Sequence, residues 1–519
     1  MTTLARFVLG LDCSTSASKA VVWDCQGNAI AEGHCPLALS TPHPGWHEQP
    51  SESWWTATAQ AIRQAVSPVD TGRLRALCIA HQRETFVAVD KQGRPLVEGI
   101  LWMDERARDL LPGLEQALGQ QDFHRITGKR LSVNLTIAKI AWLRKHRPDV
   151  FAQTHKYLDV HSFLVHRLTG VYGAGWGCAD PTGMFDMQRK TWAEPFLDQV
   201  GIRLDQLPDL YPPGAVIGAV TPAAAEACGL PVGLPVAAGI GDGQASGLGV
   251  NITGPGDAYL SLGTSVIAGT WSERYVFDPA CRTMTGGVPG SYLLETVLLG
   301  GGYTLSWFME KIAGRPDRDL AQLRELYEEA AAALPPGSEG LVLVPYWNSV
   351  LGPYWDPAAS GIVVGWRGNH GLPHLYRAIL EGIALELHLG EVSVEKAMGQ
   401  SVKRYIAMGG GAQSDLWRQI IADVTGKPVF RAATVEAASL GAGILAATAA
   451  GWYTDARQVA QAMTRILPQP AEPDPARHEF YNRLFEEVYR PLFPALQPHL
   501  ERLAALSENT DLLLPERCL

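Results

Sequence analysis

Apolar runs and small polar turns alternate at the start of the chain, in the pattern of strands joined by a tight turn. Residues 7–12 (FVLGLD) predict a buried strand, and residues 19–24 (KAVVWD) predict a second one. The turn between them, residues 13–18 (CSTSAS), consists mostly of small and hydroxyl-bearing residues. We therefore expect a β-hairpin over residues 7–32 that opens a sheet and presents hydroxyl and backbone N–H groups at its tip.

The same pattern recurs after the middle of the chain. Residues 257–262 (DAYLSL) and 266–271 (VIAGTW) predict two strands with a Gly-Thr-Ser turn between them. Two such hairpins, half a chain apart, indicate a duplicated fold whose two lobes direct their turns at one shared cleft. Gly and Pro residues within 250–256 mark the boundary. We expect an N-terminal lobe over residues 1–250 and a C-terminal lobe over residues 251–519.

Helices and strands alternate over the rest of the chain. Residues 54–66 and 373–398 have the spacing of amphipathic helices, residues 341–346 that of a strand, and residues 475–506 that of a long helix. This alternation predicts an α/β fold. Residues 437–454 carry no charge, but they are mostly Ala, Gly, Ser and Thr, which favours a tightly packed buried helix over a membrane span.

The composition limits the class of protein. The chain has 519 residues, of which 46% are hydrophobic, and a net charge of −10. It is too long for one ordinary domain, and it lacks the basic patch of a nucleic-acid-binding protein. Its eight cysteines are scattered, with no C-x-x-C pair and no histidines at zinc-finger spacing, so we expect reduced thiols. No signal-peptide pattern precedes the first strand, which favours a cytoplasmic location.

Small turns that follow strands carry candidate chemistry. They contain Gly, Ser and Thr within residues 12–16, 263–265 and 408–414, where backbone N–H groups and hydroxyls can approach a phosphate. The P-loop pattern G-x-x-x-x-G-K-[ST] is absent, so these turns predict a different polyphosphate site, held between the lobes. Asp12, inside the first turn, suits a Mg²⁺ ion that keeps its water ligands.

A second carboxylate, Asp242, lies among glycines in residues 239–243 (GIGDG), where the backbone is open to a ligand. Two interpretations follow from these residues alone. Asp242 either caps a helix that begins at Gly243 or Gln244, or it acts as a base toward a bound substrate.

Five motifs in order along the chain resemble the FGGY family of carbohydrate kinases. They are residues 9–15 (LGLDCST) with Asp24, residues 45–50 (GWHEQP) with Trp54 and Trp55, residues 241–243 (GDG), residues 260–265 (LSLGTS), and residues 409–414 (GGGAQS) with segments 422–424 and 436–442. The resemblance covers nearly the whole chain. It implies two similar actin-like, ribonuclease-H-like lobes with ATP and Mg²⁺ in a central cleft, and transfer of the γ-phosphoryl group to a primary hydroxyl of a small sugar or polyol.

The resemblance also implies roles for individual residues. Asp242 is the expected catalytic base, and Asp12 is the expected Mg²⁺ site, through water. The expected substrate-binding residues lie after a predicted strand and around the base: Gln82, Arg83, Glu84, Asp242, Gly243 and Gln244. The expected ATP- and phosphate-binding residues lie in or near the small turns: Asp12, Ser14, Thr15, Lys19, Gly263, Thr264, Ser265, Gly302, Ser306, Gly410, Gly411 and Ser414.

The motifs point to different substrates. Residues 81–85 (HQRET) resemble the glycerol kinases, and Arg83 with Glu84 can donate to and accept from adjacent hydroxyls. The phosphate turns and the Trp54-Trp55 pair resemble the xylulokinases instead. Gly243 and Asn134 stand where glycerol kinases have larger side chains, which predicts a substrate longer than glycerol.

We therefore expect a ketose kinase of the xylulose type. A glycerol or four-carbon polyol kinase is the nearer alternative, and an actin-like ATPase without a sugar substrate is the distant one. The expected partner is the small sugar or polyol, with no nucleic acid and no membrane. The sequence leaves open whether the chain forms a homodimer.

Overall fold

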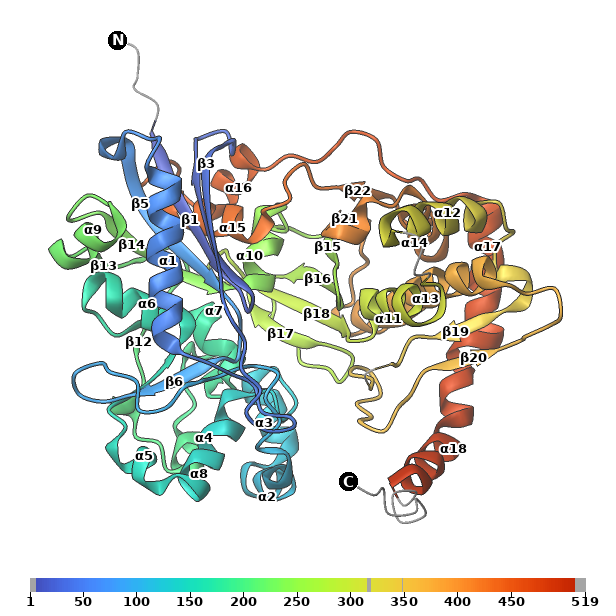
Figure 1. Ribbon diagram of the computed structural model, residues 1–519, viewed down its shortest axis with the longest axis horizontal. Helices are drawn as coiled ribbons and strands as arrows, with labels where there is room; N and C mark the ends of the chain where they lie inside the picture. Colours follow the sequence, from blue (N-terminus) through green and yellow to red (C-terminus); the bar gives the residue numbers. More distant parts are fainter. Residues whose placement is uncertain (1–5, 315–318, 348, 509–519) are drawn as a thin grey trace, which may run out of the picture.

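Two six-stranded sheets form the framework of the molecule. The computed structural model describes residues 6–314, 319–347 and 349–508 (Figure 1). The first sheet has the order β13 (Val216–Ala219), β14 (Pro235–Gly241), β5 (Leu74–His81), β1 (Phe7–Cys13), β2 (Ala17–Trp23) and β3 (Ala29–Pro36). The second has the order β17 (Arg282–Thr285), β18 (Tyr292–Leu298), β16 (Val266–Ser272), β15 (Asp257–Leu262), β21 (Arg404–Met408) and β22 (Val429–Arg431).

The two sheets repeat one five-stranded pattern. β1 runs antiparallel to β2 and parallel to β5, and β15 runs antiparallel to β16 and parallel to β21. The pattern extends to β3 and β14 in the first sheet and to β18 and β22 in the second. Both predicted hairpins are present, and Leu262 pairs with Val266 around the second turn. The α/β duplication expected from the sequence is confirmed.

Smaller sheets and helices complete each half. A four-stranded sheet has the order β4 (Glu48–Gln49), β7 (Gly99–Ile100), β6 (Phe86–Val89) and β8 (Lys156–Asp159). Two-stranded pairs are β9 (Gly173–Gly175) with β12 (Asp209–Tyr211), β10 (Phe185–Asp186) with β11 (Thr191–Trp192), and β19 (Val342–Val344) with β20 (Ile362–Val364). The helices before the second sheet are α1 (Ser51–Val66), α2 (Leu111–Leu118), α3 (Gln120–Thr127), α4 (Thr136–His146), α5 (Pro148–Gln153), α6 (Val160–Thr169), α7 (Trp176–Ala179), α8 (Glu194–Val200), α9 (Pro222–Cys228) and α10 (Asp242–Gly249). The later ones are α11 (Gly301–Trp307), α12 (Leu320–Ala332), α13 (Leu372–Met398), α14 (Asp415–Thr425), α15 (Ala437–Ala449), α16 (Ala456–Met463), α17 (Pro475–Leu484) and α18 (Arg490–Glu508).

The first sheet is covered on both faces, which explains why its strands read as continuous apolar runs. On β1, Leu9 and Leu11 join a core with helices α1, α6 and α9. Val8 points to the other face and joins a core with α10, α15 and α16. Because successive side chains of a strand point to opposite faces, both sets must be apolar.

Helix α15, from the C-terminal half of the chain, packs on the first sheet (Figure 1). Ser439 of this helix donates a hydrogen bond from its Oγ to the carbonyl oxygen of Gly10 at 3.0 Å. A side chain at Gly10 would meet the Ser439 carbonyl oxygen 2.0 Å from its Cβ, so only glycine allows this contact. The buried helix predicted within residues 437–454 is confirmed. Among the described helices, none has both the length and the apolar character needed to cross a membrane.

The second sheet packs against the long helix α13, whose central residues are buried. Its predicted bounds, 373–398, agree with the structure to one residue. The helix predicted over residues 475–506 consists of α17, a π-helical turn at Phe485–Tyr489, and α18, which contains Pro494 and Pro498. Because proline has no N–H to donate, these positions interrupt the helical hydrogen bonds.

Candidate active site

Asp242 lies at the junction of β14 and α10, beside Arg83. Its side chain is 42% exposed, and Oδ1 lies 3.2 Å from Arg83 Nε. The same oxygen accepts a hydrogen bond from the Gly243 N–H at 2.7 Å. The helix begins at Asp242 itself and Gly241 occupies the cap position, so Asp242 is not the cap of a helix that begins later. The glycine at 241 is required because a Cβ there would lie 2.5 Å from the Arg83 side chain.

Arg83 belongs to a chain of alternating charges that connects the two halves of the molecule. Its Nη1 donates to Glu295 Oε2 at 2.7 Å, and Glu295 lies on β18 of the second sheet. Arg282, on β17, donates from Nε to the same oxygen at 3.1 Å. Arg282 Nη1 also lies 3.4 Å from Glu84 Oε1, back in the N-terminal half. The order Asp242, Arg83, Glu295, Arg282, Glu84 thus pairs each charge with its opposite.

Pairing maintains the charges of this buried network. Burial alone would disfavour the charge of Glu295, but Arg83 and Arg282 lower its pKa to about 2. Burial likewise opposes the charge of Arg83, and the carboxylates of Glu295 and Asp242 hold its pKa well above the usual value. The Tyr259 hydroxyl adds a hydrogen bond to Glu295 at 2.6 Å. The guanidinium of Arg83 is therefore fixed and charged next to Asp242.

The backbone turn that carries Glu84 is fixed by hydrogen bonds from α4. Glu84 has a positive φ of 57°, which is uncommon for a residue other than glycine. Its carbonyl oxygen accepts hydrogen bonds from Thr136 Oγ1 at 3.1 Å and Lys139 Nζ at 3.0 Å. Burial lowers the pKa of Lys139 to about 7. These contacts fix the direction of the short segment between β5 and β6.

Two other predicted substrate residues, Gln82 and Gln244, form hydrogen bonds within the protein. Gln82 is buried and accepts a hydrogen bond from Thr15 Oγ1 at 2.9 Å. Thr15 Oγ1 also accepts from Trp102 Nε1 at 3.1 Å, so both hydrogen-bonding directions of this hydroxyl are used within the protein. Gln244 is buried too, and its Nε2 donates to the Gly177 carbonyl oxygen at 3.0 Å. The hydrogen bond between Thr15 and Gln82 therefore joins the first small turn to the segment 82–84, which holds the predicted substrate residues.

Asp12 lies at the end of β1, opposite Lys19 in the β1–β2 register. Burial, together with the nearby charge of Asp242, raises the pKa of Asp12 to about 7, while Lys19 opposes the shift. Its Oδ1 is buried and has no hydrogen-bond partner among the described residues. Lys19 itself is paired with Glu436, with its Nζ 2.9 Å from Oε1. A buried carboxylate oxygen without a partner fits a cation held directly or through water.

The candidate phosphate turns of the second sheet lie together. The Gly302 N–H donates to the Gly263 carbonyl oxygen at 3.1 Å, which places the start of α11 on the β15–β16 turn. Gly263 and Thr264 are exposed, as is Ser306 on α11. Gly410 and Gly411 follow β21, the parallel neighbour of β15, and a Cβ at Gly411 would lie 2.8 Å from the Leu262 side chain.

Two hydroxyls of the predicted nucleotide site, those of Ser14 and Ser414, already have partners within the protein. Ser414 caps α14: its Oγ accepts from the Trp417 N–H and donates to Glu328. Ser14 donates from Oγ to the Ala17 carbonyl oxygen at 3.0 Å, and so stabilises the first turn. Ser265 lies in the second turn and is partly exposed.

The structure corrects one sequence argument and adds two residues. A Cβ on Gly243 would lie 2.8 Å from Glu295 Oε1 and 3.0 Å from Arg83 Nη2. The prediction that Gly243 leaves room for a longer substrate is therefore wrong, because Arg83 and Glu295 fill that space. Asn134 donates from Nδ2 to the Trp102 carbonyl oxygen at 3.0 Å. Sequence reasoning missed Glu295 and Arg282; the one available signal was a glutamate within the otherwise mostly apolar strand 292–298 (YLLETVL).

Known proteins match this chain over most of its length. Residues 7–249 match the model of the N-terminal domain of the FGGY family of carbohydrate kinases, and residues 258–450 match its C-terminal domain. A xylulose kinase from Escherichia coli is 31% identical over 94% of this chain and 99% of its own. The solved structure of a xylulose kinase from Rhodospirillum rubrum is similar with a TM-score of 0.89, at 29% identity, over 96% of this chain and 100% of its own. A gluconate kinase from Lactobacillus acidophilus has a TM-score of 0.90, at 25% identity and the same coverage.

Proposed function

Because the chain belongs to the FGGY family of carbohydrate kinases, we propose that it phosphorylates a five-carbon ketose of the xylulose type, with ATP as the phosphoryl donor. The relative from Escherichia coli and the similar structure from Rhodospirillum rubrum, both xylulose kinases, support this substrate class. The observation that carries the proposal is the contact between Asp242 and Arg83 at 3.2 Å. It supports the proposal because a half-exposed carboxylate lies beside a fixed guanidinium that can donate to a hydroxyl.

Asp242 acts as the general base in this proposal. It accepts the proton of the attacking hydroxyl as the phosphoryl group is transferred, a role that needs a carboxylate in hydrogen-bond reach of the substrate. Arg83 and Glu84 bind adjacent hydroxyls as donor and acceptor, and Glu295 and Arg282 hold these two side chains in place. Positioning of this kind supplies much of the catalysis in phosphoryl transfer.

The small turns bind ATP in this proposal. Backbone N–H groups around residues 13–16 and 263–265 contact the phosphates, and the glycines at 302, 410 and 411 allow the nucleotide to approach the backbone. Asp12 holds Mg²⁺, through water, with its unpartnered Oδ1. When bound, the magnesium ion offsets the negative charge of the phosphates. A cytoplasmic location and a homodimer remain predictions.

A second candidate substrate class is glycerol or a four-carbon polyol. One observation favours it: Arg83 and Glu84, the pair shared with glycerol kinases, both lie at the site and are both held by second-sheet residues. The correction at Gly243 adds to this alternative, because it removes one argument for a longer substrate.

A substrate panel separates the two candidates. The wild-type enzyme is assayed for ADP release with xylulose, ribulose, erythritol, glycerol and gluconate, each with ATP and Mg²⁺. We expect the highest kcat/KM with a ketopentose. A higher value with erythritol or glycerol would transfer the assignment to the polyol class, and ATP hydrolysis without dependence on any of the five would contradict both.

A further inference from the structure

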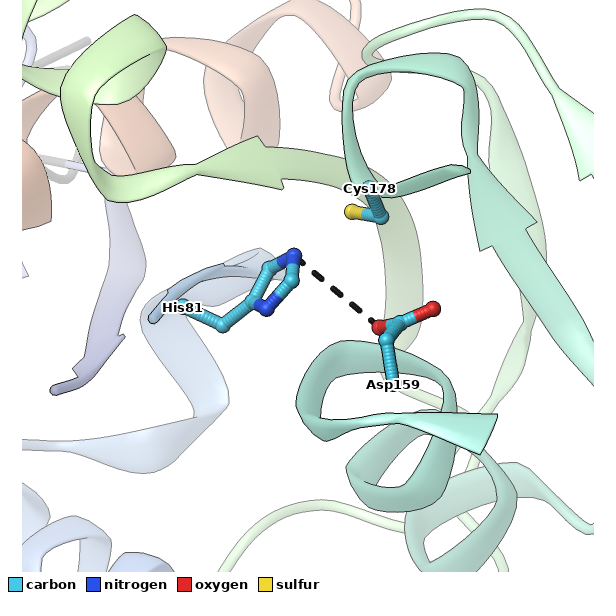
Figure 2. A group of neighbouring side chains, drawn as sticks. All are labelled: His81, Asp159 and Cys178. Atoms are coloured by element: carbon cyan, nitrogen blue, oxygen red, sulfur yellow. Dashed lines mark ion pairs between the residues drawn. The ribbon is translucent and has the colours of Figure 1, made fainter. Parts of the chain in front are cut away.

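Three buried side chains outside the catalytic machinery converge on one point. His81 is the last residue of β5, Asp159 ends β8 and caps α6, and Cys178 lies in α7. Each offers one ligand atom, and these atoms all lie within 4.8 Å of one another. Figure 2 shows the imidazole, the carboxylate and the thiol turned toward each other from these separate elements.

The hydrogen bonds of His81 define which of its nitrogens faces the group. Nδ1 lies 2.7 Å from the Gln82 carbonyl oxygen, which can only accept, so Nδ1 carries a proton. In the neutral ring, Nε2 then presents a lone pair. It is buried, has no hydrogen-bond partner among the described residues, and faces Asp159 Oδ1 at 3.9 Å (Figure 2).

Two electron-rich atoms therefore face each other across a buried space. The separation of 3.9 Å is too long for a hydrogen bond. His81 Nε2 is the buried atom without a partner, which is costly. Asp159 Oδ1 already accepts from the Ser162 N–H at 2.9 Å and keeps a further lone pair for a cation.

The third ligand indicates a divalent, thiophilic cation. The Cys178 sulfur is buried and lies within 4.8 Å of the His81 and Asp159 ligand atoms, and a cysteine binds a metal ion as the thiolate. When the thiol binds a divalent ion, its proton is released to solvent. The dication, the Cys178 thiolate and the Asp159 carboxylate then sum to zero charge, and His81 stays neutral. One sulfur, one imidazole nitrogen and one carboxylate oxygen are ligands that Zn²⁺ accepts.

The surroundings of the group match those of a metal site. Metal-binding histidines donate their other N–H to a carbonyl or carboxylate, as His81 does to Gln82. Asp159 is oriented in turn by Ser162, whose N–H donates to Oδ1 at 2.9 Å and whose Oγ donates to Oδ2 at 2.7 Å. His161, next to the group, already accepts from the Gly239 N–H with its Nε2 at 2.9 Å.

We propose that His81, Asp159 and Cys178 bind one zinc ion, at a site separate from the predicted Mg²⁺ site at Asp12. Three protein ligands leave a position for a water molecule, as in other zinc sites with three ligands. His81 directly precedes the segment Gln82 to Glu84, and it pairs in register with Gly241, the residue before Asp242. The bound ion would join the end of β5, after which the predicted substrate residues begin, to the start of α6 and to α7.

Metal content tests the site directly. The full chain is treated with a chelator, dialysed, reconstituted with zinc and dialysed again, and its zinc is measured by inductively coupled plasma mass spectrometry. We expect about one zinc ion per chain and a higher Tm for the zinc-loaded protein. Cys178→Ser should lose the zinc, whereas the matched control Cys228→Ser, at another buried cysteine, should keep it.

Cobalt substitution reports the ligands without depending on a variant. The Co²⁺-loaded wild-type protein should show a thiolate-to-cobalt charge-transfer band, which Cys228→Ser retains and Cys178→Ser loses. If the wild type holds no stoichiometric zinc, or binds Co²⁺ without a thiolate band, the proposal is wrong. Retention of full zinc by folded Cys178→Ser would also overturn the site.

Discussion

At the residue scale, the proposed chemistry depends on the carboxylate of Asp242. Asp242 is half-exposed, starts α10 and contacts Arg83 and the Gly243 N–H. We predict that Asp242→Asn preserves the fold, because the amide oxygen can still accept from Gly243. Loss of a general base lowers kcat by about 10²–10⁴-fold. The measurement is ADP release at saturating sugar, with Tm and ATP binding as controls. Turnover near the wild-type rate would show that Asp242 is only a helix-start residue.

We predict that Glu84 acts in sugar recognition and not in the chemistry of ATP. Its carboxylate lies 3.4 Å from Arg282, and its backbone is held independently by Thr136 and Lys139. Glu84→Ala therefore removes the acceptor without releasing the turn. A lost hydroxyl contact costs about 1–3 kcal/mol, so kcat/KM for the sugar should fall by roughly tenfold or more. Slow ATP hydrolysis without sugar should stay unchanged. An equal fall in both activities would mean that Glu84 supports the whole site and not the sugar alone.

At the element scale, a buried glutamate connects α13 to the C-terminal helices. Glu386 accepts hydrogen bonds from Tyr346 at 2.9 Å and from Tyr489 at 2.7 Å. Burial raises its pKa from 4.5 to about 7, although the two tyrosine hydroxyls lower it. Between these two pH values the folded protein keeps a proton that the unfolded chain has lost. The contribution of Glu386 to the free energy of unfolding is therefore complete below pH 4.5 and is lost as the pH rises through 7.

Glu386→Gln should remove this pH dependence. The amide stays neutral and can still accept from the tyrosines. The free energy of unfolding of the variant should therefore rise relative to that of the wild type between pH 5 and pH 8, by up to about 3 kcal/mol. The measurement is the difference in Tm between variant and wild type at each pH. The exposed control Glu487→Gln should follow the wild type. A Tm difference that is constant across this range would contradict the prediction.

The elements also show how far the sequence could be interpreted. β1, β15 and α13 were predicted to within one residue because burial on two faces, or on one helical face, produces a regular apolar pattern. Asp242 and Arg83 could be predicted as candidate site residues because they lie in local motifs. Glu295 and its bond to Arg83 could not be predicted, since the partners are 212 residues apart and the pairing exists only once the two sheets are assembled.

The zinc ligands illustrate the same limit. His81, Asp159 and Cys178 come from a strand end, a helix cap and a short helix, and none has a second ligand at motif spacing. A spacing search finds sites whose ligands share one loop or helix. Ligands brought together by topology are visible only in three dimensions.

At the scale of the whole molecule, the two halves are joined by close helix packing as well as by charge. Helices α10 and α15 cross where glycines face backbone: a Cβ on Gly441 would lie 1.9 Å from the Ala245 carbonyl oxygen, and one on Gly249 would lie 2.0 Å from that of Ala437. Small residues allow this approach, which explains the uncharged Ala/Gly composition of residues 437–449. Because α10 begins with Asp242, the crossing also sets the position of this residue, the proposed base.

Gly441→Ala tests whether this crossing supports both stability and catalysis. The added methyl must push α10 and α15 apart, and overpacking of this kind costs about 1–3 kcal/mol. We expect a lower Tm together with a lower kcat, because Asp242 moves with α10 relative to Arg83 and the second sheet. The matched control is Gly113→Ala in α2, where a Cβ meets no atom within 4 Å. That change should leave kcat unchanged and alter stability by no more than about 1 kcal/mol, in the favourable direction, since alanine is the better helix former. A Gly441→Ala protein with wild-type Tm and kcat would show that the helices can separate without cost, and that the charge chain from Asp242 to Glu84 alone sets the relation between the two halves.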